Sequence, residues 1–259
     1  MTKNFHSSDR NFDDISQRFK RTIYDTPKGL LRLLALKTDF QELQLPLAAS
    51  QVLDLGGGQG QFSLWCAEQG AKITLVDISE EMLQQARILF SDAQQELMTL
   101  NSPLQQLEND IHQQYDLVFN HAVLEWLEEP LAALRVITEH VKPGGYLSLM
   151  FYNRDGHYWR QLMNGRTHDP LSANQRLQHE GNSPKHLFNP DDIIQTVEDF
   201  GMTCLRWRGI RCIHDHMHQK IRERIGQNSV NETDLKIGLE EPFKRLGRYV
   251  HAIFQRDDE

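Results

Sequence analysis

The sequence predicts an α/β fold built on a doubly wound parallel sheet, and three observations predict it. From residue 51 onward, short apolar segments typical of strands alternate with amphipathic segments typical of helices. Four glycines fill the five positions from Gly56 to Gly60, directly behind the first strand segment. An acidic residue, Asp77, ends the second strand segment. A glycine turn and an acid at strand ends are typical of sheets that bind a ligand along their carboxyl edge.

Each expected element follows from local patterns. Helices at 12–24 and 28–45, where apolar residues recur three and four positions apart, form an N-terminal helical cap. The strands are expected at residues 51–55, 71–77, 96–100, 115–121, 146–153, 202–213 and 245–256. The helices between them are expected at residues 61–70, 79–90, 130–145 and 190–201. Ser79 has the side chain to cap the second of these, and Pro143 with two glycines ends the third.

The chain, residues 1–259, is expected to form a single domain, because its length suits one core with a sizeable insertion. Residues 153–189 interrupt the alternation after the fifth strand with a polar stretch rich in His and Asn. We expect this insertion to lie over the open edge of the site. The other parts are a cap at 9–48, a ligand-binding core at 51–152 and a completion of the sheet on the substrate side at 190–256.

Composition excludes several classes of protein. Hydrophobic residues make up 39% and charged residues 25%, as in soluble globular proteins. No apolar run reaches the roughly 18 residues of a membrane helix. The first residues lack the apolar core of a signal peptide, so we expect a cytoplasmic protein without membrane contact. Cys66, Cys204 and Cys212 fit neither a zinc site nor a disulfide framework by their spacing, and no metal is expected.

A net charge of −8 disfavours polyanions overall, but two segments are basic. Residues 1–38 contain eight Lys or Arg and four Asp, and residues 203–225 contain six Lys or Arg and two acids. Each segment therefore has a net charge of +4. Such segments are usually solvated surface, and they can also attract RNA.

The pattern of the glycine loop indicates its ligand. A nicotinamide dinucleotide site would have a third glycine at position 61, where this chain has glutamine. The pattern D-x-G-x-G-x-G fits instead, with Asp54, Gly56, Gly58 and Gly60. A carboxylate beside the loop repels a pyrophosphate and attracts the ammonium and sulfonium groups of S-adenosylmethionine. Asp77, 19 residues after Gly58, is placed to accept the ribose hydroxyls, so the sequence predicts this methyl donor.

The adenine contact, the role of His121 and the methyl acceptor are indicated less directly by the sequence. After the third strand there is no carboxylate, so the backbone of Leu104 and Gln105 is expected to contact adenine. His121 could be a base, could hydrogen-bond the donor, or could only cap its strand. The segment that follows lacks the Asn/Asp-Pro-Pro-aromatic tetrad of amine methylases, and no cysteine lies near it. The expected acceptor is oxygen or another ready nucleophile.

The chain resembles the bacterial tRNA 5-carboxymethoxyuridine methyltransferases in six segments: DRNFDDISQRFKRTIYDTPKGLLR, VLDLGGGQGQ, HAVLEWLEEP, KPGGYLSLMFYN, GIRCIHDHM and LGRYVHAIF. The resemblance covers residues 9–254. The glycine loop is shared with all class I S-adenosylmethionine-dependent methyltransferases, whereas the first and fifth segments are more particular. The family has an Asp at the third-strand turn near Leu104, where this chain departs from the pattern.

The resemblance implies a seven-stranded, Rossmann-like class I methyltransferase sheet. It implies methyl transfer from S-adenosylmethionine to the carboxylate of 5-carboxymethoxyuridine at wobble position 34. The products are the ester 5-methoxycarbonylmethoxyuridine and S-adenosyl-L-homocysteine. By motif position it implies donor contacts from Arg32, Gly56, Gly57, Asp77 and His121. The guanidinium of Arg32, on the cap helix, suits the donor's carboxylate.

An ionised carboxylate needs no base, so no catalytic residue of the acid–base type is expected. The candidate substrate-binding residues are cations and rings: Arg21, Tyr24, Tyr152, Arg211 and Arg248. The expected partner is the tRNA anticodon loop, which is already single-stranded and would be held by the basic segments 18–37 and 206–224. No protein partner is predicted.

Two alternatives stay open. A S-adenosylmethionine-dependent O-methyltransferase of a small-molecule carboxylic acid or quinone precursor would use the same glycine loop. A non-catalytic protein would bind the donor only to stabilise a partner, and it would form no product.

Overall fold

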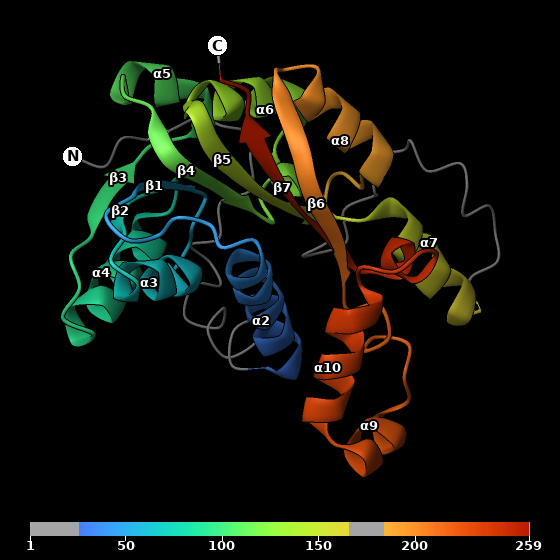
Figure 1. The fold of residues 1–259 in the computed structure, drawn as a ribbon. Helices are drawn as coiled ribbons and strands as arrows, with labels where there is room; N and C mark the ends of the chain where they lie inside the picture. Colours follow the sequence, from blue (N-terminus) through green and yellow to red (C-terminus); the bar gives the residue numbers. More distant parts are fainter. Residues whose placement is uncertain (1–25, 166–183, 259) are drawn as a thin grey trace.

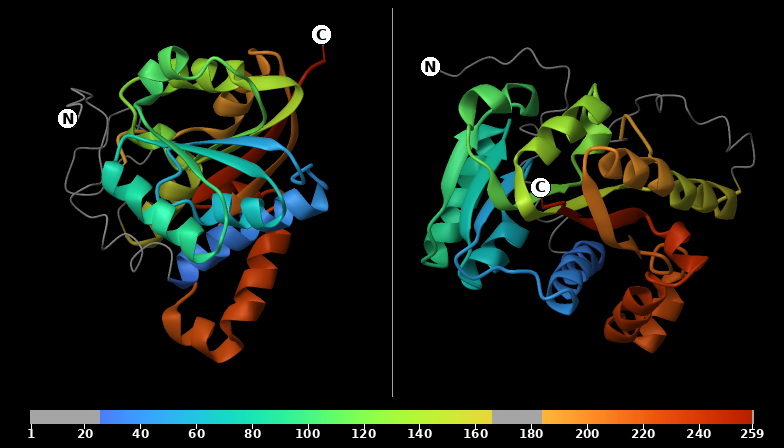
Figure 2. Two further views of the ribbon diagram at one scale, coloured as in Figure 1. Left: turned by 90° about the vertical axis from the view of Figure 1, so that its left-hand side faces the viewer. Right: turned by 45° about the horizontal axis from the view of Figure 1, so that its top comes forward.

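The computed structural model describes residues 26–165 and 184–258, which form a seven-stranded mixed sheet with helices on both faces (Figures 1 and 2). This confirms the predicted fold class. The helix predicted at 12–24 and the candidate residues Arg21 and Tyr24 lie outside the described residues.

The sheet has the order β3-β2-β1-β4-β5-β7-β6. Its strands are β1 (Gln51–Leu55), β2 (Lys72–Asp77), β3 (Met98–Asn101), β4 (Tyr115–His121), β5 (Val141–Tyr152), β6 (Met202–Ile210) and β7 (Tyr249–Arg256). Only β7 is antiparallel to its neighbours, β5 and β6. The strand order reverses between β1 and β4, and a crevice at the carboxyl ends of such strands is where open α/β sheets bind ligands.

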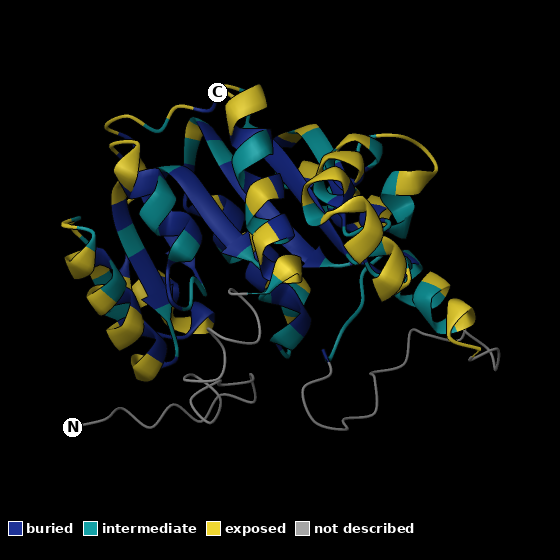
Figure 3. Ribbon diagram, turned by 90° about the horizontal axis from the view of Figure 1, so that it is seen from below, coloured by how far each residue is buried: buried dark blue, intermediate teal, exposed yellow. Residues whose placement is uncertain are grey.

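Helices cover both faces of the sheet, and the strands between them are buried (Figure 3). The helices α2 (Pro27–Glu42), α3 (Gln61–Glu68) and α4 (Glu80–Asp92) pack on one face. The helices α5 (Leu107–Asp110), α6 (Pro130–Glu139) and α8 (Pro190–Glu198) pack on the other. The remaining described helices are α7 (Arg154–Met163), α9 (Gln219–Ile225), α10 (Gln227–Ile237) and the short η3 (Leu104–Gln106), η4 (Leu124–Trp126) and η5 (Phe243–Leu246).

The helix α2 positions one wall of the site. Thr26 caps it by accepting a hydrogen bond from the Gly29 N–H at 3.1 Å, and Pro27 suits its first turn. Its inner face buries Leu31, Ala35, Leu36, Phe40 and, unexpectedly among apolar residues, Asp39. The helix therefore docks through an apolar stripe that contains one buried carboxylate.

The helix predicted at 130–145 was wrong in its end, and three helices were not predicted. The helix expected at 130–145 ends at Glu139, and the KPGG segment belongs to β5, running beside β4. A Cβ at Gly145 would lie 3.0 Å from the Asp116 carbonyl oxygen, so the glycine permits this close approach. The sequence also gave no sign of α7, α9 and α10. The helix α9 buries no residue and α10 buries only Val230 and Asp234, so neither has an apolar stripe.

The division into cap, core and insertion remains a prediction. Within the described ranges, no helix combines the length and the apolar composition that crossing a membrane requires.

Candidate functional site

The glycine loop turns at the carboxyl end of β1 with backbone angles that suit glycine. Gly56 has φ +72°, and a Cβ there would lie 2.4 Å from Val123 Cγ2. A Cβ at Gly57 would lie 2.4 Å from the Asp54 carboxylate. Side chains at these positions would displace their neighbours, so the loop keeps its backbone bare toward the crevice.

Asp77 and Asp54 flank this loop. Asp77 accepts hydrogen bonds from the Gly58 and Ser79 N–H groups, both at 2.9 Å, and so holds the loop against β2. Asp54 is 4% exposed and accepts a 2.6 Å hydrogen bond from the Ser63 hydroxyl. The pKa of Asp54 is raised to about 7, mainly by burial and to a smaller extent by Asp77, against the lowering effect of the Ser63 hydrogen bond. A cation bound here would favour the ionised carboxylate, which is the charge preference predicted from the sequence.

The structure brings five of the predicted donor residues to one cavity between α2 and the loop: Arg32, Asp54, Gly56, Gly57 and His121. Gly58 and Asp77 meet at its edge through their hydrogen bond. The contacts that these residues make with a donor remain proposals.

The turn after β3 contains a carboxylate that sequence reasoning missed. Leu104 is buried in η3 and Gln105 is exposed beside it. Asp110, six residues beyond Leu104, accepts a 2.6 Å hydrogen bond from Ser102. The short helix α5 thus places the Asp110 carboxylate near the carboxyl end of β3. The residues that directly follow β3 in the sequence include no acid, so this contact could not be predicted.

His121 is the end of a buried polar chain that links four elements. Its Nε2 lies 2.8 Å from the Ser148 hydroxyl, which lies 2.8 Å from Nε2 of His251. Nδ1 of His251 is 2.7 Å from a carboxylate oxygen of Asp39 on α2. Burial, with the charges of His251 and Arg32, lowers the pKa of His121 well below its ordinary value. His121 is therefore a neutral, fixed ring at the cavity.

Asp39 also anchors β6 to α2. The fully buried Arg208 donates from Nε to Asp39 at 2.9 Å, and Arg206 lies 3.3 Å from the same oxygen. The hydrogen bond and charge of His251, followed by those of Arg208, outweigh the cost of burial and lower the pKa of Asp39. The sequence signal for this residue was a carboxylate on the apolar stripe of a helix.

A second cluster, of tyrosines and arginines, adjoins the cavity. The hydroxyl groups of Tyr152 and Tyr249 lie 3.1 Å apart. The Arg248 guanidinium lies 4.8 Å from the Tyr152 ring centroid. The guanidinium groups of Arg32 and Arg211 lie 5.8 Å and 5.7 Å from the Tyr249 ring centroid. We call these five residues the Arg–Tyr cluster; it unites three predicted substrate residues with Arg32, a predicted donor residue.

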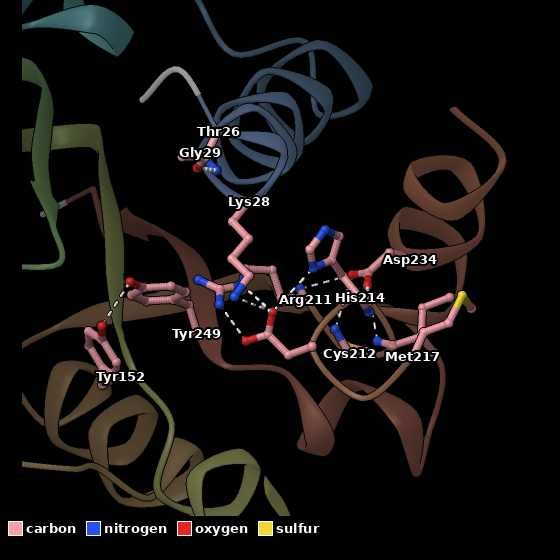
Figure 4. A network of polar contacts seen from close by, with 12 residues as sticks. Thr26, Lys28, Gly29, Tyr152, Arg211, Cys212, His214, Met217, Asp234 and Tyr249 are labelled. Atoms are coloured by element: carbon pink, nitrogen blue, oxygen red, sulfur yellow. Dashed lines mark hydrogen bonds and ion pairs between the residues drawn. The ribbon is translucent and has the colours of Figure 1, made fainter. Parts of the chain in front are cut away.

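The GIRCIHD segment is folded around Asp234 (Figure 4). The Asp234 carboxylate accepts four backbone N–H hydrogen bonds, from residues 211 to 214, at 2.9 to 3.1 Å. Arg211 there has φ +66° and donates through two nitrogens to Asp215. Burial, which would lower the pKa of Arg211, is outweighed by Asp215, and its pKa is raised. Of the predicted substrate arginines, Arg211 is thus already paired.

Glu125, on η4, is fully buried, and neither of its carboxylate oxygens has a hydrogen-bond partner. Burial raises its pKa to about 8, against the smaller effects of backbone groups and of Arg32 and Arg248. At neutral pH the side chain is a neutral acid beside the Arg–Tyr cluster. Within 26–165 and 184–258, no group of three or more His, Cys, Asp or Glu is arranged to hold a metal ion.

Comparison with known proteins agrees with this geometry. The methyltransferase domain family matches residues 16–206. Magnesium protoporphyrin IX methyltransferase from Synechocystis PCC 6803, solved with S-adenosylhomocysteine bound, has the same fold, with a TM-score of 0.66 and 17% identity over 95% of this chain and 96% of that one. A putative methyltransferase of Haloferax volcanii aligns with a TM-score of 0.63 and 15% identity over 98% and 99% of the two chains. Fold and site therefore define a class I methyltransferase.

Relatives in sequence narrow this class. The tRNA 5-carboxymethoxyuridine methyltransferase of Escherichia coli K12 is 31% identical over 252 residues, covering 96% of this chain and 97% of its own. A ubiquinone biosynthesis O-methyltransferase of Bordetella avium is 27% identical over 191 residues, 74% of this chain and 76% of its own. The chain belongs to the family of bacterial tRNA 5-carboxymethoxyuridine methyltransferases, as the sequence motifs predicted.

Proposed function

We propose that the protein transfers a methyl group from S-adenosylmethionine to the carboxylate of 5-carboxymethoxyuridine at tRNA position 34, forming 5-methoxycarbonylmethoxyuridine. The observation that carries the proposal is the Arg–Tyr cluster beside the glycine-loop cavity. The similarity to the Escherichia coli tRNA 5-carboxymethoxyuridine methyltransferase over 96% of this chain supports it. The cluster combines aromatic faces with guanidinium groups, as an acidic pyrimidine requires.

On the donor side, the bare loop and its two carboxylates fit S-adenosylmethionine. When bound, this cofactor supplies an electrophilic methyl group on a sulfonium. Asp54 would face the cationic part, Asp77 the ribose, and Arg32 the donor's carboxylate. His121, held neutral and fixed by Ser148, would orient the donor without taking a proton.

On the acceptor side, no residue has to remove a proton, because the attacking carboxylate is already ionised. Arg248 is the candidate partner of that carboxylate, since Asp215 already binds Arg211. The Tyr152 ring beneath Arg248 fixes the guanidinium, and the neighbouring ring of Tyr249 extends the aromatic face. Catalysis then consists mainly of orientation, which can supply roughly 7–11 kcal/mol.

The test uses the purified protein, methyl-labelled S-adenosylmethionine and total tRNA from cells that lack the enzyme. We expect label in tRNA that mild alkali releases as methanol, because an ester is base-labile. Mass spectrometry of the digested nucleosides should find the mass of 5-methoxycarbonylmethoxyuridine. The matched control is tRNA from cells that cannot make 5-carboxymethoxyuridine, which should accept no label.

Three results would contradict the proposal. Base-stable label in tRNA would mean methylation of another atom. Label confined to the small-molecule fraction would support an O-methyltransferase of a small acid or quinone precursor. Donor binding measured by calorimetry without any product would support a non-catalytic role.

A further inference from the structure

A second cavity, of about 540 Å³, lies outside the site just described. It is bounded by the first residues of α2, by His214, and by α9 with the start of α10. The views of the fold show α9 and α10 projecting from the sheet beside the end of α2 (Figures 1 and 2). Nothing in the donor or acceptor chemistry proposed above uses this cavity.

The cavity has a buried polar atom that lacks a partner. His214 is 2% exposed, and its backbone N–H is held by Asp234 at 3.1 Å. Its Nδ1 lies 3.2 Å from Asp215, while its Nε2 has no hydrogen-bond partner. Figure 4 shows the ring rising from the loop with this second nitrogen turned toward the α2 side. A buried nitrogen without a partner on a cavity wall is costly unless a ligand meets it.

The charged side chains that line the cavity are the cations Lys28 and Arg222 and one acid, Glu223. Lys28 Nζ lies 3.9 Å from Asp215, but both oxygens of that carboxylate already accept hydrogen bonds from Arg211. The pKa of Lys28 is lowered, first by burial and then by Arg211, Arg160 and Arg222, against Asp215. An anion among these groups would remove their mutual repulsion.

The backbone of α2 adds to this preference. The helix is 16 residues long, and its N-terminal end borders the cavity. A helix N-terminus bears partial positive charge and favours anions. The first turn of α2 has no acidic residue and instead contains Lys28, a cation where one is ordinarily unfavourable. A bound anion explains both the lysine and the missing acid.

We propose that this cavity binds a backbone phosphate of the RNA substrate, close to the nucleotide that is methylated. The proposal rests on the proposed function, because it supplies the phosphate from the same tRNA. Lys28 precedes the donor residue Arg32 by one helical turn, roughly 6 Å along α2. Arg211 joins the two regions, since it lies over the Tyr249 ring and also binds Asp215, the carboxylate beside Lys28 (Figure 4). A nucleotide whose base lies in the Arg–Tyr cluster would thus have a phosphate within reach of the cavity.

The variant Lys28→Gln removes one charge from a side chain that is 47% exposed, so the fold should tolerate it. Lys142→Gln is the matched control, because it makes the same change at a lysine of β5 that is 39% exposed and pairs with Asp116 at 2.7 Å. Binding of a fluorescent anticodon stem-loop RNA is measured by anisotropy across a salt series. We expect Lys28→Gln to weaken binding about fivefold and to reduce the slope of log affinity against log salt by about 0.7. Lys142→Gln should match the wild-type protein in both.

A set of chemically modified RNAs identifies the phosphate that Lys28 binds. In a set of RNAs, each phosphate within three nucleotides of position 34 is replaced in turn by an uncharged methylphosphonate. At one position we expect a loss of affinity for the wild-type protein that disappears in Lys28→Gln, because both changes remove the same ion pair. Losses that add at every position, or equal effects of Lys28→Gln and Lys142→Gln, would overturn the phosphate site. If the wild-type protein neither binds nor methylates tRNA, the proposed function fails first, and the two failures are distinguishable.

Discussion

The His251 imidazole and the Asp39 carboxylate, 212 residues apart in the chain, lie 2.7 Å apart in the buried core. This contact joins the helix that contains Arg32 to the strand next to β5, and Ser148 extends it to His121. One polar network therefore links the helix of Arg32 to His121, two predicted donor residues that line the same cavity.

Asp39→Asn should destabilise the fold by about 3 kcal/mol, because it removes the buried one of the two carboxylates that pair with the buried Arg208 guanidinium. The measurement is urea unfolding followed by circular dichroism. The control is Glu42→Gln, which removes a carboxylate that also faces Arg208 and Arg206 but is 47% exposed. That change should cost less than about 1 kcal/mol. Equal losses in the free energy of unfolding for the two variants would show that the buried carboxylate stabilises the fold no more than the exposed one.

Donor affinity should rise with pH through the ionisation of Asp54. Its pKa of about 7 means that the carboxyl is mostly neutral at pH 6, and a cationic ligand prefers the ionised form. We expect S-adenosylmethionine to bind roughly five to ten times more tightly at pH 7.5 than at pH 6, releasing a proton at the lower pH. Calorimetry in buffers of different ionisation enthalpy measures the affinity and the number of protons released. Asp54→Asn should bind weakly with a flat profile, and a slope that survives in this variant would assign the proton elsewhere.

Glu125→Gln should change how stability depends on pH. The pKa of Glu125 is about 8 in the folded protein and about 4.5 when unfolded, so the wild-type protein loses stability as pH rises from about 4.5 to 8. The variant lacks this loss. We expect its advantage in free energy of unfolding to grow between pH 5 and 8 by on the order of 3 kcal/mol. Glu128→Gln, at a carboxylate that pairs with Lys185 at 3.3 Å, is the control and should show no such growth.

Arg248→Lys should impair the reaction with tRNA and spare donor binding. The planar guanidinium lies over the Tyr152 ring and can bind a carboxylate through two nitrogens, which an ammonium cannot do. We expect kcat/KM for tRNA to fall at least about tenfold, with the Kd for S-adenosylmethionine unchanged. Arg245→Lys makes the same change three residues away, at an arginine that pairs with Asp191 at 2.9 Å. A comparable loss in both variants would remove Arg248 from its proposed role.

The shape of the glycine loop could be predicted from sequence because its signals are local. The loop needs glycine where side chains would collide with Val123 and Asp54, and its two acids lie in the last two residues of β1 and β2. The end of the helix predicted at 130–145 was wrong because it depends on contacts between distant residues. Proline and glycine in that segment look like a helix end, but they lie within β5, between Val141 and Tyr146, which both pair with β4 across a shift of register.

The sequence by itself determined the alternation of strands and helices, the bare loop and the charge of its ligand, because each depends on residues a few positions apart. Only the tertiary structure decided which distant polar groups meet. Asp39 with His251, Arg248 with Tyr152, and Lys28 with the loop of His214 come from separate elements. Their contacts depend on strand order and helix docking, which no short stretch of sequence specifies.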